Sequence, residues 1–311
     1  MNEVKASDVF QKDKVQGLDE AMDQALNELK QEPAIYRLIH DEFHLTRAET
    51  RRSLNTLLDY REDLHYCSHC PGYEKCAKEV PHYQMNLTYE NGLMDRQLVL
   101  CDLARKRMAY ESSFIDRDFP YVWHTAEFVD LKGKAKAPLK TAMLKSLTAQ
   151  DGRWFYVQGS RGVGRTFALA VFANAWVKQQ RGDIAFVETS GFMERMKTLA
   201  LDRDKSKFAE EMERYQNCSL LVLDDFGNEA KDKTGFGYGT ILFPLLDARA
   251  KKGLCTCFSS DFTLDEVASM YATSIGRPRA RQLKDLILSM GQRAFSLIGL
   301  PGFDEGASST R

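Results

Sequence analysis

Residues 159–166 read GSRGVGRT, one residue away from a phosphate-binding loop. The usual pattern is glycine, four residues, a second glycine, lysine, and then serine or threonine. Arg165 stands where the lysine belongs. Backbone N–H groups of such a loop cradle phosphate, and the threonine hydroxyl can bind Mg²⁺. We therefore predict that ATP or ADP binds here with Mg²⁺, through Gly159, Ser160, Arg161, Gly162, Val163, Gly164, Arg165 and Thr166.

The chain around this loop alternates between short apolar segments and helical segments. An apolar strand is expected at 154–157, directly before the loop, and a helix directly after it. Further strands are expected in DIAFVET (183–189), CSLLVLDDFG (218–227) and LCTCFSSDF (254–262), with helices between them. Alternation of this kind predicts an α/β fold with a parallel sheet covered by helices on both sides.

A second motif, LLVLDDFGNE (220–229), places two aspartates at the end of an apolar strand. We expect this strand to lie beside the loop strand, with Asp224 holding Mg²⁺ and Asp225 orienting or deprotonating the attacking water. The two motifs together are far more specific than either alone. The competing interpretation is a glycine turn and a surface acidic pair in some other α/β fold.

Arg165 complicates this prediction. Lysine is a compact point charge that reaches the β- and γ-phosphates, whereas arginine is longer and planar, so the exchange is not conservative at a tight site. Binding through backbone N–H groups can survive the exchange, but we expect ATP hydrolysis to be weak or absent. The alternative is a fold of this type that binds no nucleotide.

The bulk composition limits the class of protein. A chain of 311 residues is long enough for two domains, and its net charge of −1 confines any nucleic-acid surface to a local patch. No apolar run approaches the ~18–20 residues that span a bilayer, and the first residues do not resemble a secretory signal. We therefore expect a cytoplasmic protein without membrane contact, whose cysteines bind metal or pack in cores and do not form disulfides.

The organisation before the loop changes twice. Residues 18–61 have helical periodicity, and Thr46 with Glu49 predicts a capping box. Residues 65–101 hold four of the seven cysteines and three of the six histidines, among many turn-forming residues. Residues 109–137 look like a connector. We therefore expect a helical, metal-binding domain over 1–108, a linker over 109–137 and the nucleotide-binding domain over 138–311.

Several segments together resemble one protein family. GSRGVGRTFALAVFANAW (159–176), LLVLDDFGNE and CTCFSSDFT (255–263) are similar to the AAA+ domain of bacterial helicase loaders of the DnaI/DnaC type. The earlier YCSHC…C…PHY…LC segment resembles the zinc-bearing, helicase-binding domain of the Firmicutes branch, DnaI. The resemblance runs over nearly the whole chain.

The resemblance implies a function in DNA replication. The N-terminal domain would bind the replicative DnaB-family helicase. The AAA+ domain would bind ATP and single-stranded DNA and help place the helicase ring on DNA during initiation or restart. It also implies self-association through the AAA+ domain and contact with other primosomal proteins.

The same resemblance assigns two further residues to the nucleotide site. Asp261 stands where these loaders usually have a sensor asparagine, and a carboxylate there would repel the γ-phosphate. Arg293 matches the arginine that reaches the ATP of a neighbouring subunit, where it would stabilise charge on the transferred phosphoryl group. The alternatives are that Asp261 caps the following helix and that Arg293 is a helix-surface residue in a salt bridge.

The cysteine-rich segment is expected to bind structural zinc. Cys67 and Cys70 form a C-x-x-C pair, a spacing that lets two thiolates bind one tetrahedral ion, and Cys101 can return to the same point. The fourth ligand is open: His82 best matches the family histidine, and Cys76 competes with it. The alternative is a small core of reduced cysteines. Cys218, Cys255 and Cys257 are expected to be core residues.

The sequence GRPRARQLK (276–284) is the candidate DNA surface, with Arg277, Arg279 and Arg281 contacting phosphates. A solvated charged face is the simpler alternative. Two other functions stay open for the whole chain: an ATPase helper of a transposition system, which would lack the zinc domain, and a nucleotide-independent replication scaffold with a degenerate phosphate loop.

Overall fold

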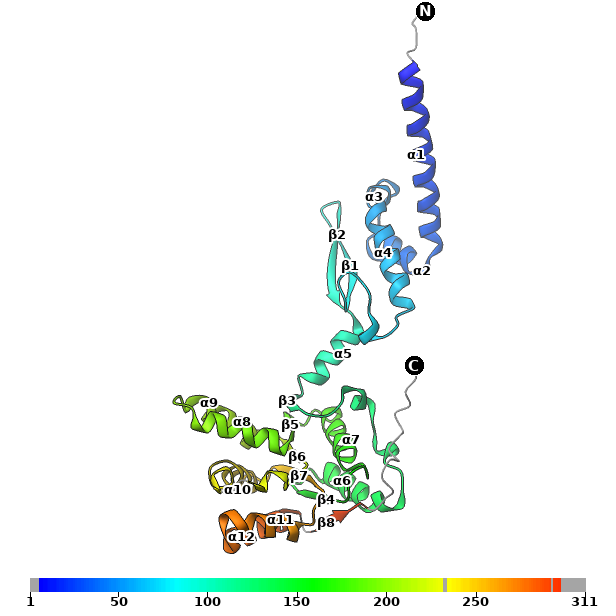
Figure 1. The fold of residues 1–311 in the computed structure, drawn as a ribbon. Helices are drawn as coiled ribbons and strands as arrows, with labels where there is room; N and C mark the ends of the chain where they lie inside the picture. Colours follow the sequence, from blue (N-terminus) through cyan, green and yellow to red (C-terminus); the bar gives the residue numbers. More distant parts are fainter. Residues whose placement is uncertain (1–5, 232–233, 292, 298–311) are drawn as a thin grey trace, which may run out of the picture. The chain divides into compact units, whose positions relative to one another are not determined.

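The computed structural model describes residues 6–231, 234–291 and 293–297, and the chain divides into two compact units, 1–109 and 110–311 (Figure 1). The first unit consists of helices followed by a β-hairpin, and the second is built on a parallel sheet. The two units are described separately below.

Helices of the first unit pack around buried leucine and isoleucine side chains, among them Leu29, Ile35 and Leu57. Thr46 accepts a hydrogen bond from the Glu49 backbone N–H and Glu49 reaches back to the Thr46 N–H, which confirms the expected capping box. The helical elements are α1 (Ala6–Gln31), α2 (Pro33–Arg37), η1 (Leu38–Glu42), α3 (Arg47–Arg52), α4 (Leu54–Ser68) and η2 (Tyr73–Lys75).

An antiparallel hairpin, which our sequence analysis missed, makes up about half of the cysteine-rich segment. Its strands are β1 (Tyr83–Glu90) and β2 (Leu93–Leu100), and α5 (Asp102–Glu111) follows. Asn91 and Gly92 have φ angles of +52° and +79°, as two-residue hairpin turns require. The Asn-Gly pair was the sequence signal for this hairpin. The Met85 N–H donates to Asp63 at 2.9 Å, which ties the hairpin to α4.

The second unit contains a six-stranded parallel sheet in the order β3-β5-β6-β7-β4-β8. Each strand follows a helix or an irregular segment, as the alternation in the sequence predicts. The strands are β3 (Phe114–Arg117), β4 (Phe155–Gln158), β5 (Ile184–Glu188), β6 (Leu220–Asp224), β7 (Cys255–Ser260) and β8 (Ala294–Ser296).

Helices cover both faces of this sheet, so the expected α/β fold is confirmed. On β6, Leu221 and Leu223 join one buried cluster with α8 to α12, whereas Leu220 and Val222 join a second with α6 and α7. This alternation follows from the period of two along a strand. The helical elements are α6 (Ala137–Ala149), α7 (Arg165–Lys178), α8 (Thr189–Leu201), α9 (Ser206–Asn217), η6 (Asn228–Lys231), η7 (Tyr238–Leu242), α10 (Phe243–Lys251), α11 (Leu264–Ile275) and α12 (Arg277–Gly291).

Residues 109–137 are not the free linker that the sequence suggested. From Tyr110 onward they belong to the second unit, and they supply the edge strand β3 and the turns η3 (Tyr121–Thr125), η4 (Phe128–Asp130) and η5 (Lys134–Lys136). Phe119 is buried against Phe186 of β5, with ring centroids 4.8 Å apart. The aromatic side chains of this segment therefore bury apolar surface that a linker would leave in water.

Strand β6 does not lie beside the loop strand β4, contrary to our expectation. Strand β7 lies between them and pairs with both. This insertion brings the end of β7 between the phosphate loop and the acidic end of β6. In the part of the chain that the structure describes, no helix is long and apolar enough to cross a membrane.

Candidate functional site

The phosphate loop leaves the carboxyl end of β4 and runs into the first turn of α7. Gly162 and Gly164 have φ angles of +88° and +84°, a backbone region that favours glycine. At Gly159 a Cβ atom would lie 2.4 Å from the Leu297 carbonyl oxygen, so a side chain there would collide with backbone. Val163 is buried, whereas Ser160 and Arg161 are exposed. The loop therefore has the local geometry of an anion cradle at a helix N-terminus.

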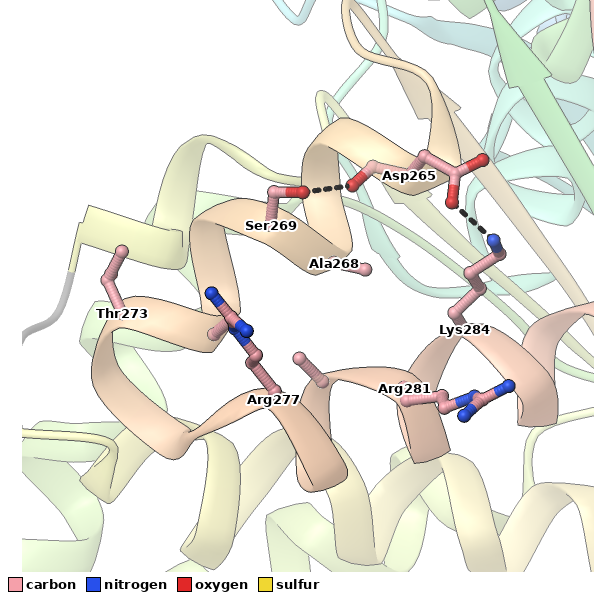
Figure 2. A pocket seen from close by; sticks show the side chains of 9 residues that line it. Asp265, Ala268, Ser269, Thr273, Arg277, Arg281 and Lys284 are labelled. Carbon is pink, nitrogen blue, oxygen red and sulfur yellow. Dashed lines mark hydrogen bonds and ion pairs between the residues drawn. The ribbon is translucent and has the colours of Figure 1, made fainter.

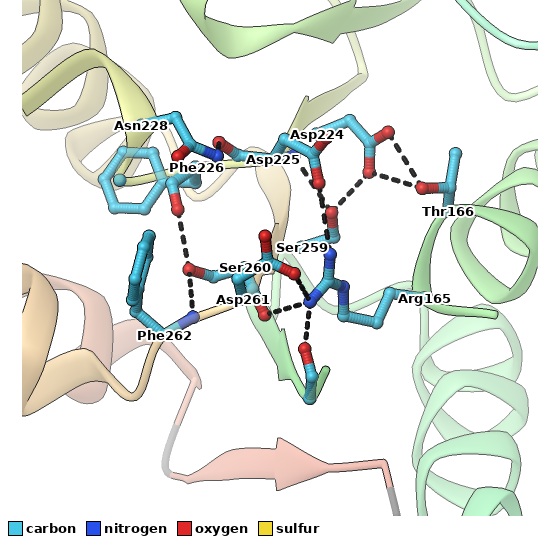
Figure 3. Close-up of polar contacts among 12 residues, drawn as sticks. Arg165, Thr166, Asp224, Asp225, Phe226, Asn228, Ser259, Ser260, Asp261 and Phe262 are labelled. Carbon is cyan, nitrogen blue, oxygen red and sulfur yellow. Dashed lines mark hydrogen bonds and ion pairs between the residues drawn. The ribbon is translucent and has the colours of Figure 1, made fainter. Parts of the chain in front are cut away.

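Asp224 and Thr166 meet across the sheet edge, although β7 separates their strands. The Thr166 hydroxyl donates to Asp224, with an Oγ1–Oδ2 distance of 2.9 Å (Figure 3). The Ser259 hydroxyl of β7 donates to the same carboxylate. Burial raises the pKa of Asp224, and these two hydrogen bonds counteract that rise. A carboxylate and a hydroxyl held together in this way are oxygen ligands that suit Mg²⁺.

Asp225 follows with an unusual backbone conformation. Its φ angle is +53°, in the left-handed region that is uncommon for residues other than glycine, although Asn and Asp enter it more readily than most. Its N–H donates to the Ser259 hydroxyl at 3.0 Å. The turn that results directs the Asp225 carboxylate toward the phosphate loop, where it accepts from Arg165.

The Arg165 guanidinium lies inside the site and is only 5% exposed (Figure 3). Its Nη1 donates to Asp261 Oδ1 at 2.5 Å and to the Ser260 carbonyl at 2.8 Å, and also to the Gly159 carbonyl. Its Nη2 lies 3.1 Å from Asp225 Oδ1. The arginine is thus bound to the chain's own carboxylates and carbonyls, an arrangement that the sequence analysis did not foresee.

Asp261 is the main partner of this arginine and is not a helix cap. Helix α11 is capped by Thr263, whose hydroxyl accepts from the Glu266 N–H in a capping box. The alternative for Asp261 was therefore wrong, because the cap lies two residues later. Arg165 and Asp261, the two residues that depart from the expected pattern, carry opposite charges and form an ion pair with each other.

Ser259 and Ser260 are site residues that we had not singled out. Both are buried at the end of β7, where Ser260 donates to the Phe226 carbonyl at 2.6 Å and so links β7 to the segment after Asp225. The signal in the sequence was a pair of hydroxyls ending an otherwise apolar strand, CTCFSS.

Arg293 lies just before β8, next to the loop strand. Its side chain is exposed, and its guanidinium lies 4.8 Å from the centroid of the Phe295 ring. Arg293 is outside α12, so it is not the helix-surface arginine of our alternative. An exposed guanidinium at this position is free to reach toward another molecule.

The candidate zinc ligands lie in the first unit but do not form a metal site in this structure. Within the described ranges, no group of three or more His, Cys, Asp or Glu side chains is arranged to hold a metal ion. The Cys67 sulfur instead lies 3.6 Å from the Lys78 ammonium group. The Cys76 sulfur accepts a hydrogen bond from the His82 N–H, and this bond is the main cause that lowers the pKa of the Cys76 thiol. The Cys101 sulfur accepts a hydrogen bond from the Ala104 N–H. Cys70 is exposed.

The expected core cysteines behave as predicted. Cys218, Cys255 and Cys257 are all buried in the second unit. Cys255 and Cys257 lie on β7, whereas Cys218 lies just before β6. Burial raises the pKa of Cys218 and of Cys257, which keeps both thiols protonated.

The three candidate DNA arginines begin α12, and they do not share one face. Arg277, Arg281 and Lys284 line a pocket of about 570 Å³ between α11 and α12, together with Asp265 (Figure 2). Their spacing of four and three residues places them on one side of the helix. Arg279 is exposed but does not line this pocket, and its carbonyl accepts from Tyr238. Lys284 forms an ion pair with Asp265, whereas Arg281 lies 4.0 Å from Asp285.

Comparisons with known proteins agree with this geometry. No protein-family model matches the chain. The chain is 26% identical over 234 residues to the replicative helicase loader DnaI of Bacillus subtilis (strain 168). The aligned region covers 72% of this chain and 73% of that protein.

Two solved structures share the fold. The crystal structure of a DnaI protein matches with a TM-score of 0.51 and 21% identity, over 62% of this chain and 98% of that one. A primosome component from Streptococcus pyogenes serotype M3, described as putative, matches with a TM-score of 0.51 and 18% identity, over 63% and 98%. At these identities the likeness concerns the fold alone, which is the helix-covered parallel sheet expected from the sequence. The chain is thus similar in sequence to a DnaI helicase loader and similar in fold to the DnaI crystal structure.

Proposed function

We propose that this chain is a helicase loader that binds the replicative helicase and helps place it on single-stranded DNA during replication initiation. The observation that supports this most is the assembled phosphate loop, in which Thr166 meets Asp224 at the carboxyl edge of an AAA+ sheet. Loop amides and the start of α7 would hold the phosphates of an adenine nucleotide, and Thr166 with Asp224 would hold Mg²⁺. The negative charge of the bound phosphates would act on the charged residues of the site.

Helicase binding is assigned to the first unit. Exposed apolar side chains there include Leu93 and Leu98 of the hairpin, at 74% and 53% exposure. We expect the full chain to co-purify with the replicative helicase of its host, and Leu93→Glu with Leu98→Glu to reduce recovery about tenfold, since desolvating a carboxylate at an apolar interface costs at least ~1.4 kcal/mol.

The matched control is Val129→Glu, an equally exposed apolar position in the second unit. This variant should co-purify like the wild type. If the wild-type chain fails to retain the helicase both with and without ATP, the loader proposal is wrong.

Single-stranded DNA is proposed to contact the α12 face of Arg277 and Arg281. Each phosphate neutralised by a protein cation contributes about −0.7 to the slope of log affinity against log salt for single strands. Replacing both arginines with alanine should therefore weaken binding and reduce the slope by about 1.4. A fluorescence anisotropy titration with an oligothymidine at several salt concentrations measures both effects.

Arg279→Ala is the control for this surface, because Arg279 is also exposed but does not line the pocket. We expect a much smaller change for Arg279→Ala. Equal slopes for the double variant and the wild type would exclude the Arg277–Arg281 face as the DNA surface.

Zinc in the first unit is a separate proposal. It is supported by the C-x-x-C spacing of Cys67 and Cys70, by backbone N–H groups directed at the Cys76 and Cys101 sulfurs, and by the buried His82 Nδ1, which has no hydrogen-bond partner in the structure. A metal ion at Cys67 has to compete with the Lys78 ammonium group that now lies beside that sulfur.

We expect elemental analysis of the purified chain to give about one zinc per chain, because a tetrahedral thiolate site in a region with little core contributes folding energy directly. Cys67→Ser and Cys101→Ser should each lose the metal, whereas His69→Gln, at an exposed neighbouring position, should keep it. Comparing His82→Ala with Cys76→Ser identifies the fourth ligand. Well under one zinc per wild-type chain would refute the proposal.

Self-association through the second unit would give Arg293 its role, because its exposed guanidinium could then reach the nucleotide of a neighbouring copy. The second candidate function is a nucleotide-independent scaffold. One observation favours it: the Arg165 guanidinium is already bound to carboxylates and a carbonyl within the chain. A transposition helper is the weaker alternative, because the cysteine-rich segment precedes the AAA+ unit.

A further inference from the structure

Arg165 and Asp261 form an internal ion pair at the place where a phosphate loop usually directs its cation to the nucleotide. The basic residue at this position ordinarily reaches the β- and γ-phosphates. Here the guanidinium donates to Asp261 Oδ1 at 2.5 Å, to the Ser260 carbonyl at 2.8 Å and to Asp225 Oδ1 at 3.1 Å. The two carboxylate partners directly follow β6 and β7 (Figure 3). The guanidinium also donates to the Gly159 carbonyl at the start of the loop, and the Gly159 N–H donates to the Ser260 carbonyl at 3.1 Å.

The charges at this end of the site disfavour a third phosphate. Arg165 contributes one positive charge, and its two carboxylate partners contribute two negative charges, so this group carries a net charge of −1. A γ-phosphate approaching Arg165 would have to displace or lie against Asp225 and Asp261, which are 27% and 26% exposed and therefore only partly screened by water. Repulsion between these carboxylates and a γ-phosphate would weaken the binding of a triphosphate.

The groups that would hold the first two phosphates are distinct from the two carboxylates of this pair, although Arg165 also donates to the Gly159 carbonyl of the loop. The positive-φ glycines Gly162 and Gly164 shape the loop, and α7 begins at Arg165 with its free N–H groups directed into the loop. Thr166 and Asp224 remain together as the oxygen pair for Mg²⁺. A diphosphate can use these groups without approaching Asp261.

We propose that the Arg165–Asp261 pair makes this site selective for a nucleoside diphosphate over a nucleoside triphosphate. The inference rests on the proposed nucleotide binding at the loop and specifies its ligand. Asp261 is then a specificity-determining residue: it neutralises the guanidinium and occupies the approach of the terminal phosphate. The chain would be held in one nucleotide state, in contrast to a switch that cycles between ATP and ADP.

The test compares the fluorescent N-methylanthraniloyl derivatives of ADP and of the β,γ-imido analogue of ATP, titrated into the full chain with Mg²⁺. We expect the wild type to bind the diphosphate about tenfold more tightly, because a partly screened like-charge contact weakens binding of the triphosphate. In Arg165→Lys/Asp261→Asn the lysine is freed and the extra carboxylate is gone, so the preference should disappear or reverse. Asp261→Asn alone should show part of the change.

The matched control is Arg47→Lys/Asp23→Asn, which makes the same two changes in an exposed ion pair of 3.2 Å in the first unit. It should keep the wild-type preference, and thermal melting of each variant verifies folding. Equal affinity of the wild type for both nucleotides, or an unchanged preference in Arg165→Lys/Asp261→Asn, overturns the inference while nucleotide binding stands. Absence of saturable binding of either nucleotide to the wild type and to this double variant at millimolar concentration refutes nucleotide binding itself.

Discussion

Asp224→Asn is expected to lower nucleotide affinity in the presence of Mg²⁺ about tenfold or more, while leaving the fold at least as stable as the wild type. The carboxylate is one of two oxygen ligands proposed for the ion, and a neutral amide is a much poorer ligand for a hard cation. The affinity measured without Mg²⁺ should change little, so the effect of the metal on binding disappears in the variant.

The stability part of this prediction follows from the burial of Asp224. Burial raises its pKa above the ordinary value of 3.8, so the protonated form is favoured in the folded state. The corresponding stability is present below pH 3.8 and is lost as the pH rises through the raised pKa. Asparagine stays neutral, so melting temperatures of the variant should not show this decline with rising pH.

Asp285→Asn, an exposed change of the same kind on α12, is the control and should alter neither property. If Asp224→Asn retains the wild-type response of nucleotide affinity to Mg²⁺, Asp224 is not a metal ligand. If it also melts well below the wild type at neutral pH, its role is structural.

Arg249→Met should destabilise the second unit by about 3 kcal/mol. Arg249 is completely buried, and its guanidinium donates to the Tyr215 and Cys218 carbonyls at 2.8 Å each and to the Cys255 carbonyl at 2.5 Å. Its Nε donates to the Thr256 hydroxyl at 3.0 Å. Methionine fills a similar volume but donates nothing, and each buried carbonyl left without a donor costs about 1 kcal/mol or more.

For a unit of this size, such a loss lowers the melting temperature by roughly 6–12 °C. Arg47→Met is the control, because the Arg47 side chain is 76% exposed and surface substitutions usually change stability by less than about 0.5 kcal/mol. A melting temperature for Arg249→Met within 2 °C of the wild type would mean that the bonds of Arg249 add little net stability (roughly 0.5 kcal/mol).

Arg249 and Arg165 show how the same residue type can serve different purposes in one domain. Arg249 ties the end of α9 to β7 through neutral groups. Arg165 also donates several hydrogen bonds, but its partners include two carboxylates of the candidate site. A buried ion pair is weak evidence for stability, because the cost of desolvation offsets much of the attraction. We therefore assign Arg165 a role in ligand choice.

Much of the second unit was predictable from local sequence. The alternation of apolar strands with helices predicted the parallel sheet, and the glycine spacing of the loop predicted its position between β4 and α7. The capping box at Thr46 was also found from a four-residue pattern. Such features depend on backbone conformation and on periodic burial, which neighbouring residues specify.

Other features depended on contacts between distant segments. Residues 109–137 have the composition of a connector, yet Phe119 packs against Phe186 and β3 forms the sheet edge. The hairpin of the first unit was overlooked although Asn91-Gly92 indicated it. Arg279 was grouped with Arg277 and Arg281 because they are close in sequence, whereas the helical repeat separates it from their pocket.

The sequence by itself determined that the chain has a phosphate loop, an acidic strand end and an α/β sheet, because glycine spacing and hydrophobic periodicity act over a few residues. It also showed that positions 165 and 261 differ from the family pattern. Only the tertiary structure decided what those two differences mean. Strand β7 lies between β4 and β6 and brings Asp261, 96 residues away along the chain, within hydrogen-bonding distance of Arg165. Strand order in a sheet depends on long-range packing, so two apparent defects in the sequence form one ion pair in the fold.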